Sequence, residues 1–392
     1  MVAVDDGAAA AAGRMRGMIA AIAAISIFAF SLSLSIPLFS ILLERMGASG
    51  FMIGLSGASA AVAILIGGPL LPMALRFVSL PFLMVAACLG MAGLLLVFPF
   101  FPDPWIWIGL RFVFGFGAAA LFFASELWII SAAPPGKRGL AIGVYGLFLS
   151  LGFLAGPALL KLIGTVGWAP FIAGAAICLV AIPPVLLAWG DRPDTSESGG
   201  GGASPSEVIR FFRTDPAVLW AVALFGLIET GAMGLLPVWS LRLGLGEQAA
   251  LTLVALVAAG NVLMQIPMGW IGDKLDRRRL LGFCALSAVA AAWAVPTLSG
   301  TEWPLWLVTA FWGGLVVGLY TFSLNELGSR YEGAALARGT GAFMSAYGLG
   351  ALVSPPLLGF ALDMFPPHGL FWIVALAAAA YVAMLALRPR RR

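Results

Sequence analysis

Long apolar stretches with few polar interruptions make up most of this chain. A bilayer core about 30 Å thick is crossed by roughly 20 residues of helix. Hydrocarbon offers no water to backbone amides, so only helices or closed barrels can span it. The stretches are too long for barrel strands, and the pattern predicts twelve membrane-spanning helices, near residues 17–43, 50–75, 80–100, 104–132, 139–163, 168–189, 216–241, 249–272, 279–298, 304–328, 335–362 and 368–388.

One local pattern within the first span favours a different element. Residues 31–37 read SLSLSIP, an alternation typical of a half-buried strand. No charge interrupts residues 17–43, however, and that run is far longer than a strand. We therefore expect a helix with Ser31 and Ser35 on one face and Ser33 on the opposite face. Pro37 lacks the amide that would bond to the Ser33 carbonyl, which predicts a kink there.

Composition leads to the same fold class. The 392 residues are 61% hydrophobic and only 10% charged, and the mean hydropathy is +1.02. One soluble core could not bury that much apolar surface, so we expect an all-α membrane protein. The N-terminal region shows no cleavage-site pattern, and the first apolar run is expected to remain as a membrane helix.

Basic residues are distributed unevenly between the two sides of the predicted bundle. The chain has 22 Lys and Arg residues, and one set of loops and tails carries 18 of them. Arg45, Lys161 and Arg242 lie on the other side, and Arg111 lies within a span. Lys and Arg accumulate on the cytoplasmic side of membrane proteins. We expect a multi-pass protein of a bacterial cytoplasmic (inner) membrane with both termini cytoplasmic. This spread of charge also accounts for a pI near 9.2 without nucleic-acid binding.

A polar, Gly/Ser-rich segment divides the chain. Residues 191–215 read as a linker. Within it, SEVIRFFR at 206–213 mixes apolar and charged positions in a way that suits a short helix lying on the cytoplasmic membrane surface. The predicted domains are a six-helix bundle over 1–190 and a second over 216–392.

The two halves also correspond at a fixed offset of 200 residues. Residues 143–157 share their Gly and Pro spacing with 341–355, near that offset. The matched pairs are Pro37 with Pro237, Ser40 with Ser240, Glu126 with Glu326, Arg138 with Arg338 and Phe171 with Phe371. Two parallel six-helix repeats are a known architecture for alternating access, with a site where the halves meet near the midplane.

The loop after the eighth span carries the most specific motif. GWIGDKLDRR at 269–278 resembles the loop signature of the major facilitator superfamily: Gly, a small residue, Asp, a basic residue and a closing Arg pair. Its first-half counterpart, 67–77, keeps Gly68 and Arg76 but has Pro72 where Asp is expected. The resemblance covers nearly the whole chain and implies two pseudo-symmetric six-helix bundles whose loops latch the cytoplasmic side.

Two further motifs resemble those of the proton-coupled drug antiporters. RFVFGFGAA at 111–119 is similar to their intramembrane Arg motif, with Phe114 in place of Gln, and 143–157 is similar to their antiporter motif, with Leu160 and Lys161 in place of the closing Gly pair. The resemblance implies proton-coupled export. Small-residue spacing also serves helix packing, so an uptake symporter or a facilitator for a neutral metabolite stays open.

Apart from the basic residues at span ends, which are counted with the loops above, four ionisable residues lie inside the predicted spans, where charge is costly and suggests a function: Arg111, Glu126, Glu229 and Glu326. Glu229 lies near the midplane of span seven, and the repeat aligns it with Ala29, so symmetry does not require it. Burial favours a neutral carboxyl that can take up and release a proton. Glu229 is our candidate for the coupling proton or a cationic substrate; the alternative is a hydrogen-bonded structural Glu.

The other three ionisable residues lie nearer the ends of their spans. Arg111 is expected either to snorkel to the interface or, by resemblance, to stay in the interior and tune the proton site or hold an anionic group. Glu126 and Glu326 are expected to form gating ion pairs rather than to contact substrate. Their expected partners are Arg138, Arg338 and the loop that carries Asp273, Arg277 and Arg278.

Neutral polar residues complete a candidate cavity. Asn261 and Gln265 share one face of span eight, and amides in lipid are best explained by a protein or water partner. Each residue alone also suits helix packing, whereas the set suits a mostly apolar cavity with few polar anchors. The expected lining residues are Ser31, Ser35, Tyr145, Thr230, Asn261, Gln265, Tyr320 and Tyr347.

Some functions lack support in the sequence. Only Arg111 could meet a polyanion near the midplane, and no nucleophile–base cluster or phosphate-binding loop occurs, so we expect no enzyme, ATP coupling, cofactor or metal. Cys88, Cys178 and Cys284 read as packing residues. We expect the protein to be a monomer. Its expected partners are protons, membrane lipids and a small lipophilic solute that is neutral or monocationic. A receptor-like or lipid-moving protein on the same fold is the alternative from another class.

Overall fold

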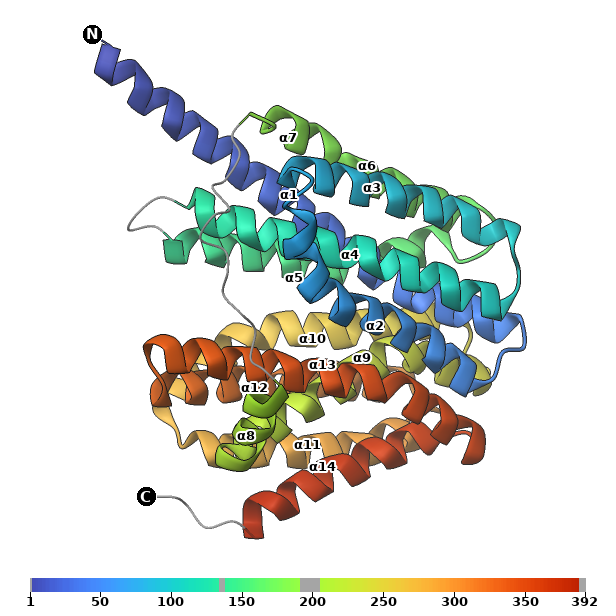
Figure 1. Cartoon of the computed structure of the whole chain (residues 1–392). Helices are drawn as coiled ribbons and strands as arrows, with labels where there is room; N and C mark the ends of the chain where they lie inside the picture. The colour runs from blue at the N-terminus through green and yellow to red at the C-terminus, as the bar shows by residue number, and fades with distance from the viewer. Residues whose placement is uncertain (1, 134–137, 191–204, 388–392) are drawn as a thin grey trace. The chain divides into compact units, whose positions relative to one another are not determined.

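The computed structural model describes residues 2–133, 138–190 and 205–387, without the side chains of 2–11, 68, 69, 138, 139, 142, 205, 273, 333, 334 and 337 (Figure 1). Over these ranges the chain forms helices and no strand. Twelve helical segments are long and apolar enough to cross a membrane, which confirms the predicted number. The helices are α1 Val2–Arg45, α2 Gly50–Ala74, α3 Leu80–Val97 with the 3-10 turn η1 Phe98–Phe100, α4 Pro104–Ala132, α5 Arg138–Ile163, α6 Ala169–Val180, α7 Ile182–Leu187, α8 Pro205–Thr214, α9 Pro216–Arg242, α10 Glu247–Lys274, α11 Arg277–Thr297, α12 Glu302–Arg330, α13 Gly333–Met364 and α14 Gly369–Leu387.

The alternating stretch SLSLSIP lies inside α1, as the surrounding apolar run predicted. Ser33 is buried and donates a hydrogen bond of 3.0 Å to the Gly152 carbonyl of α5. A Cβ atom on Gly156 would lie 2.2 Å from the Ser33 hydroxyl oxygen, so α1 and α5 touch through small residues. The serines therefore satisfy their hydroxyls while two helices pack closely.

The sixth predicted span is broken in the structure. It consists of α6 and α7, which meet at Ala181. Pro183 and Pro184 follow after one residue, Ile182, and neither proline has an amide N–H to donate to the preceding turn. Together the two helices still form one candidate span, Ala169–Leu187.

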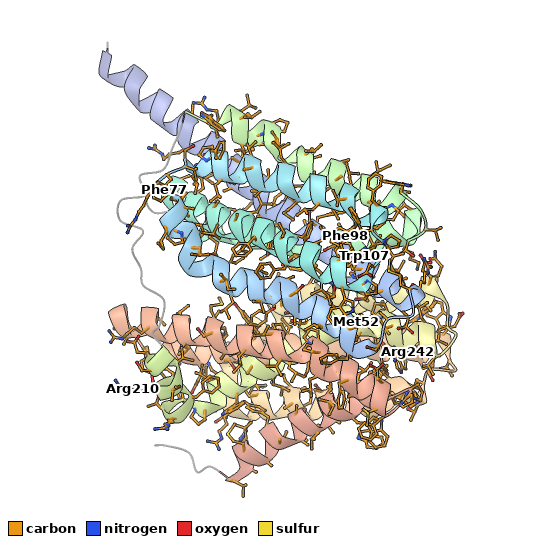
Figure 2. The ribbon with its side chains drawn as sticks, turned by 45° about the vertical axis from the view of Figure 1, so that its right-hand side comes forward. Met52, Phe77, Phe98, Trp107, Arg210 and Arg242 are labelled. Atoms are coloured by element: carbon orange, nitrogen blue, oxygen red, sulfur yellow. The ribbon has the colours of Figure 1, made fainter. Side chains whose placement is uncertain are left out.

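The amphipathic segment in the linker forms a helix, α8, as predicted. Val208, Phe211 and Phe212 pack against a buried cluster of the second unit, a contact that the sequence did not predict. The Phe211 ring lies 5.5 Å from the Tyr331 ring. Its pattern therefore marks a docking face on the protein. Arg210 lies on the exposed side of the same helix, as Figure 2 shows.

The chain divides into two compact units. The first comprises Met1–Phe39 and Ser59–Gly200, and the second comprises Ser40–Ala58 and Gly201–Arg392. The boundary thus crosses α1 and α2 as well as the linker. The reason lies in the second unit, where a Cβ atom on Gly359 of α13 would lie 1.9 Å from the Gly50 carbonyl oxygen of α2. Glycine at both positions lets the two backbones touch.

Aromatic side chains fill the core of the first unit at one end. The Phe39, Phe98 and Trp107 rings lie 4.3 to 5.5 Å apart, and Figure 2 shows Phe98 beside Trp107. Tilted and edge-on contacts of this kind stabilise beyond the area they bury. All three predicted packing cysteines are buried, and Cys178 lies 3.2 Å from the Ser31 hydroxyl.

Candidate functional site

Glu229 on α9 is the centre of a polar cluster that three helices of the second unit build. The Tyr347 hydroxyl of α13 donates a hydrogen bond of 2.8 Å to one carboxylate oxygen. The Asn261 amide of α10 donates a bond of 3.3 Å to the other. Both oxygens of this carboxylate thus have a donor, as a polar group inside a membrane protein requires.

Glycine contacts set the register that brings Tyr347 to Glu229. A Cβ atom on Gly226 of α9 would lie 2.4 Å from the Tyr347 carbonyl oxygen. One on Gly350 of α13 would lie 2.0 Å from the Ala223 carbonyl oxygen. The helices α9 and α13 therefore pack backbone to backbone on either side of Tyr347. Any larger residue at these two positions would push the helices apart.

A second pair of close contacts places Asn261. A Cβ atom on Gly260 of α10 would lie 1.9 Å from the Ala310 carbonyl oxygen of α12. Conversely, a Cβ atom on Gly313 of α12 would lie 2.2 Å from the Val257 carbonyl oxygen of α10. The closely packed α10–α12 pair thus presents the Asn261 amide to α9.

A small cavity of about 10 Å³ adjoins the carboxylate. This is the space that one water molecule needs. Trp312 of α12 lines it, is 2% exposed and has no hydrogen-bond partner for its indole nitrogen within the described residues. The full lining is Phe225, Ile228, Glu229, Ala232, Val257, Asn261, Trp312, Gly313 and Val316.

Aromatic rings surround this cluster. The Phe225 ring lies 5.5 Å from the Tyr320 ring and 6.0 Å from the Tyr347 ring. The Thr230 hydroxyl also interacts with the Tyr347 hydroxyl. Thr230, Asn261, Tyr320 and Tyr347, all predicted as cavity residues, thus gather at Glu229. The result is one carboxylate with neutral donors and apolar or aromatic walls.

Gln265 lies apart from this cluster, although it shares a predicted face with Asn261. Its side chain is exposed and has no hydrogen-bond partner in the described part of the chain. One helical turn therefore separates an amide that binds Glu229 from one that does not.

Three predicted cavity residues belong to the first unit, and each is satisfied within it. The Ser31 hydroxyl contacts Cys178 at 3.2 Å. Ser35 donates to the Leu32 carbonyl of its own helix at 3.2 Å. The Tyr145 hydroxyl lies 2.9 Å from the Ser125 hydroxyl. Each of the three hydroxyls therefore has a partner within the first unit, and none of the three residues belongs to the Glu229 cluster.

Arg111 lies in the interior of the first unit. Its side chain is 4% exposed, and its guanidinium carbon lies 5.3 Å from the centroid of the Phe39 ring. A cation over an aromatic face is stabilised by the ring quadrupole. The structure therefore favours the interior position over snorkelling to the interface.

The predicted gating residues form part of an ionic cluster at the α8 end of the second unit. Glu326 pairs with Arg277 at 3.3 Å and with Arg330. Arg338 pairs with Glu207 of α8 at 3.6 Å instead of with Glu326. Arg278 donates to the Leu385 carbonyl.

Glu126, the repeat counterpart of Glu326, has no ion pair within the described residues and is exposed. Arg138 was expected beside it. The side chains of Arg138 and Asp273 lie outside the described residues. The two repeat-related glutamates thus differ in their ionic surroundings.

The sequence interpretation missed Asp215, which completes the ionic cluster. Asp215 is 5% exposed, pairs with Arg330 at 2.6 Å and accepts a hydrogen bond from the Tyr331 hydroxyl. Burial and the neighbouring Asp215 raise the pKa of Tyr331. An Asp directly before a Pro that begins a helix was the available signal.

A second ionic cluster was also missed, at the opposite end of the second unit. Arg242 pairs with Glu44 at 2.8 Å and with Asp363 at 2.9 Å. Asp363 also accepts hydrogen bonds of 2.8 and 2.9 Å from the amides of Gly50 and Phe51, the first residues of α2. A carboxylate at a helix N-terminus satisfies amides that have no partner in the helix. The sequence signal for this cluster was the presence of charged residues, Glu44, Arg242 and Asp363, at the ends of three spans.

Known proteins resemble the chain along its length. The sequence profile of the Major Facilitator Superfamily matches residues 21–331 and 253–392. YfkF of Bacillus subtilis (strain 168), described as an uncharacterized MFS-type transporter, is 27% identical over 381 residues, which cover 93% of this chain and 94% of that protein. YcaD of an Escherichia coli strain, with the same description, is 21% identical and covers 78% of this chain and 76% of its own length.

Solved transporters share the fold at lower identity. The nucleoside transporter NupG superposes with a TM-score of 0.75 at 13% identity, covering 95% of this chain and 98% of that one. A D-xylose–proton symporter has a TM-score of 0.69 at 16% identity, covering 95% and 96%. The family profile, the twelve spans and these folds agree: the chain belongs to the Major Facilitator Superfamily and is a membrane transporter of that kind.

Proposed function

We propose that this transporter couples proton movement to the passage of a small solute, with Glu229 as the proton site. The observation that carries the proposal is the surroundings of Glu229: a carboxylate held by two neutral donors, Tyr347 and Asn261, among aromatic walls. An ionisable side chain inside a membrane span costs free energy, and such residues usually have a function.

The two protonation states of Glu229 make different hydrogen bonds. In the charged state both carboxylate oxygens can accept the hydrogen bonds that Tyr347 and Asn261 are positioned to donate. The neutral acid has a proton of its own to donate, and the Tyr347 hydroxyl can turn to accept it. Protonation therefore changes the contact between α9 and α13, and this change gives the proton a way to bias alternating access.

The proposed substrate is lipophilic and either neutral or monocationic. No Lys or Arg lines the cavity beside Glu229, so a polyanion would lack a partner there. Aromatic faces and one carboxylate suit a cationic or hydrogen-bonding group on an apolar body.

We propose export as the direction, on the antiporter-like motifs at 111–119 and 143–157. The alternative is proton-coupled uptake of a neutral metabolite, the kind of activity named for the solved D-xylose–proton symporter. We propose, from the excess of Lys and Arg in one set of loops, that α8 and both termini lie on the cytoplasmic side. On this orientation, Glu326 and Arg277 belong to a cytoplasmic latch, and Arg242, Glu44 and Asp363 to an outer one.

The test is transport of ethidium and of tetraphenylphosphonium, two lipophilic monocations, in everted vesicles with an imposed pH gradient. We expect wild-type protein to accumulate at least one of them, and Glu229→Gln to abolish gradient-driven accumulation. Glu302→Gln is the matched control, because Glu302 is exposed at the start of α12. Full gradient-driven transport by Glu229→Gln would remove Glu229 from the mechanism. Accumulation only in right-side-out vesicles would favour uptake.

A further inference from the structure

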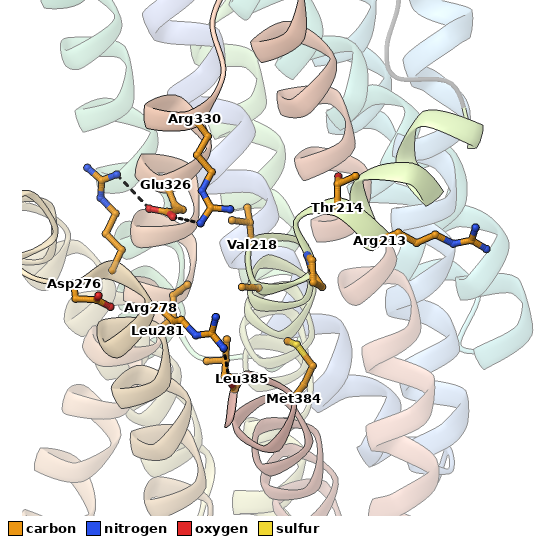
Figure 3. Close-up of a pocket in the computed structure, with 13 residues that line it drawn as sticks. Arg213, Thr214, Val218, Asp276, Arg278, Leu281, Glu326, Arg330, Met384 and Leu385 are labelled. Atoms are coloured by element: carbon orange, nitrogen blue, oxygen red, sulfur yellow. Dashed lines mark hydrogen bonds and ion pairs between the residues drawn. The ribbon is translucent and has the colours of Figure 1, made fainter. Parts of the chain in front are cut away.

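A larger cavity lies in the second unit, at the end that carries α8, away from Glu229. Its volume is about 380 Å³, and the ends of α8, α9, α11, α12 and α14 form it (Figure 3). Glu326 and Arg277, which we assign to the cytoplasmic latch, are part of its wall, but neither the proton site nor the proposed solute uses this space. All of its lining residues belong to one compact unit.

Basic side chains dominate the polar part of its lining. Four arginines, Arg213, Arg277, Arg278 and Arg330, are set against Asp276 and Glu326. Figure 3 shows Arg330 directed at Glu326, Arg278 directed at Leu385, and Arg213 pointing away from them. The Asp276 carboxylate accepts a hydrogen bond of 2.9 Å from the Arg279 amide and so caps α11. The arginines thus outnumber the acids within the cavity.

The remaining wall of the cavity is apolar. Val218, Leu281, Met384 and Leu385 face it beside the arginines (Figure 3). A soluble anion would leave this apolar surface in contact with water. An amphiphilic anion would cover both parts of the wall.

Exposed tryptophans of the kind found at membrane–water interfaces lie near the cavity in the sequence. Trp270, in the last turns of α10, is 62% exposed, and the Lys274 ammonium lies 3.6 Å from the centroid of its ring. Trp220, one turn into α9, is half exposed and packs on Phe212 at 5.1 Å. Exposed Trp residues with nearby Lys mark the membrane–water interface. Asp276 and Pro216, which line the cavity, lie within a few residues of these two positions.

We propose that this cavity binds the phosphate headgroup of an anionic phospholipid, with the acyl chains lying along its apolar wall. Guanidinium groups bind phosphate oxygens in a bidentate manner. Basic pockets between membrane helices at the cytoplasmic face are suited to such headgroups. The lipid would bridge α11, α12 and α14 and so stabilise the second unit.

The test is thermal unfolding of the purified full chain in detergent. Phosphatidylglycerol is added at increasing mole fraction, and phosphatidylcholine is added in parallel. We expect phosphatidylglycerol to raise Tm in a saturable manner and phosphatidylcholine to have no such effect, because binding to the native state alone stabilises it. Inorganic phosphate, which shares the headgroup chemistry but not the apolar part, is expected to leave Tm unchanged. Equal stabilisation by both lipids, or by phosphate alone, would overturn the proposal.

Variants locate the effect. Arg278→Gln is expected to weaken the apparent affinity for phosphatidylglycerol about tenfold, the cost of one charged hydrogen-bonded contact. Arg278→Lys keeps the charge, and its affinity for phosphatidylglycerol is expected to lie between those of the wild type and Arg278→Gln. Arg210→Gln is the matched control, because Arg210 is exposed on α8 and does not line the cavity. Unchanged affinity in Arg278→Gln would contradict the proposal.

A second measurement needs no variant. Photoactivatable phosphatidylglycerol is crosslinked to the wild-type protein, and the labelled peptides are mapped. We expect labels within 276–281 and around Leu385. Labels confined to other helices would overturn the assignment even if Arg278→Gln fails to fold.

Discussion

Tyr347 donates a hydrogen bond of 2.8 Å to Glu229, a residue 118 positions earlier in the chain. Removing the hydroxyl in Tyr347→Phe takes one donor from the charged carboxylate. Glu229 should then hold its proton to higher pH, and the pH of half-maximal gradient-driven transport should rise by about one unit. The pH profile of vesicle transport measures this. Tyr381→Phe is the control, because the Tyr381 hydroxyl donates to the Ala217 carbonyl and not to Glu229. An unchanged profile in Tyr347→Phe would contradict the assigned role.

Asn261 and Gln265 provide a matched pair on one helix. Asn261→Ala removes the donor to the other carboxylate oxygen, and transport is expected to fall about tenfold. Gln265→Ala removes an exposed amide and should change transport less than twofold by the same reasoning. Initial rates at saturating gradient compare the two. Equal losses would mean that the bond to Glu229 does not explain the role of Asn261.

The glycine contacts between α9 and α13 predict a stability difference within one helix. Gly226→Ala places a methyl group 2.4 Å from the Tyr347 carbonyl oxygen, which should cost about 1–3 kcal/mol. Gly234→Ala on the same helix meets nothing within 4 Å and should be neutral or stabilising. Thermal unfolding in detergent distinguishes them. A Gly226→Ala protein as stable as wild type would show that the helices are not in backbone contact.

The repeat-related glutamates should respond differently to neutralisation. Glu326→Gln breaks ion pairs with Arg277 and Arg330 and leaves both arginines without a carboxylate partner at this position. We expect a loss of about 1 kcal/mol, because these pairs are partly exposed. Glu126→Gln breaks no ion pair among the described residues and should change stability by less than about 0.5 kcal/mol. The reverse order of unfolding temperatures would show that Glu126 carries the latch.

His368, in the loop between α13 and α14, makes stability depend on pH. The Trp239 indole donates a bond of 3.2 Å to its Nδ1, and burial lowers the pKa of His368 below its usual value near 6.5. The neutral form is therefore favoured in the folded protein. Its stabilising effect is fully present above the unfolded pKa and is lost as pH falls through the folded pKa.

Unfolding temperatures at pH 7.5 and pH 5 measure this effect. Wild-type protein should lose more stability over that interval than His368→Gln, which cannot titrate. An equal loss in the two proteins would assign the acid sensitivity to other groups.

The sequence predicted the fold well because membrane spans leave a strong signal. Every backbone amide in lipid must be paired within its own helix, so length and hydropathy alone define twelve spans. The alternating serines at 31–35 would predict a strand if taken alone, but the long apolar run around them correctly predicts a helix. The break at Ala181 followed from two prolines, yet the length of the apolar run concealed it.

The site was predictable only in part. Glu229 was found because a charge in a span is costly, whereas its partners depend on which helices touch. Asn261 and Gln265 have the same sequence signal, and only packing against α9 separates them. Asp215 and Arg242 lie at span ends, where a charge is ordinary in sequence, so their ion pairs required the tertiary structure. The α8 pattern could not distinguish a protein surface from a membrane surface.

The most direct test of the central claim counts protons at Glu229. A ligand from a thermal-shift screen at two pH values is added to purified protein in weak buffer, and a pH-sensitive dye records the protons exchanged. We predict close to one proton per bound ligand for the wild type and none for Glu229→Gln, with ligand binding retained. The same proton exchange in both proteins would contradict the account.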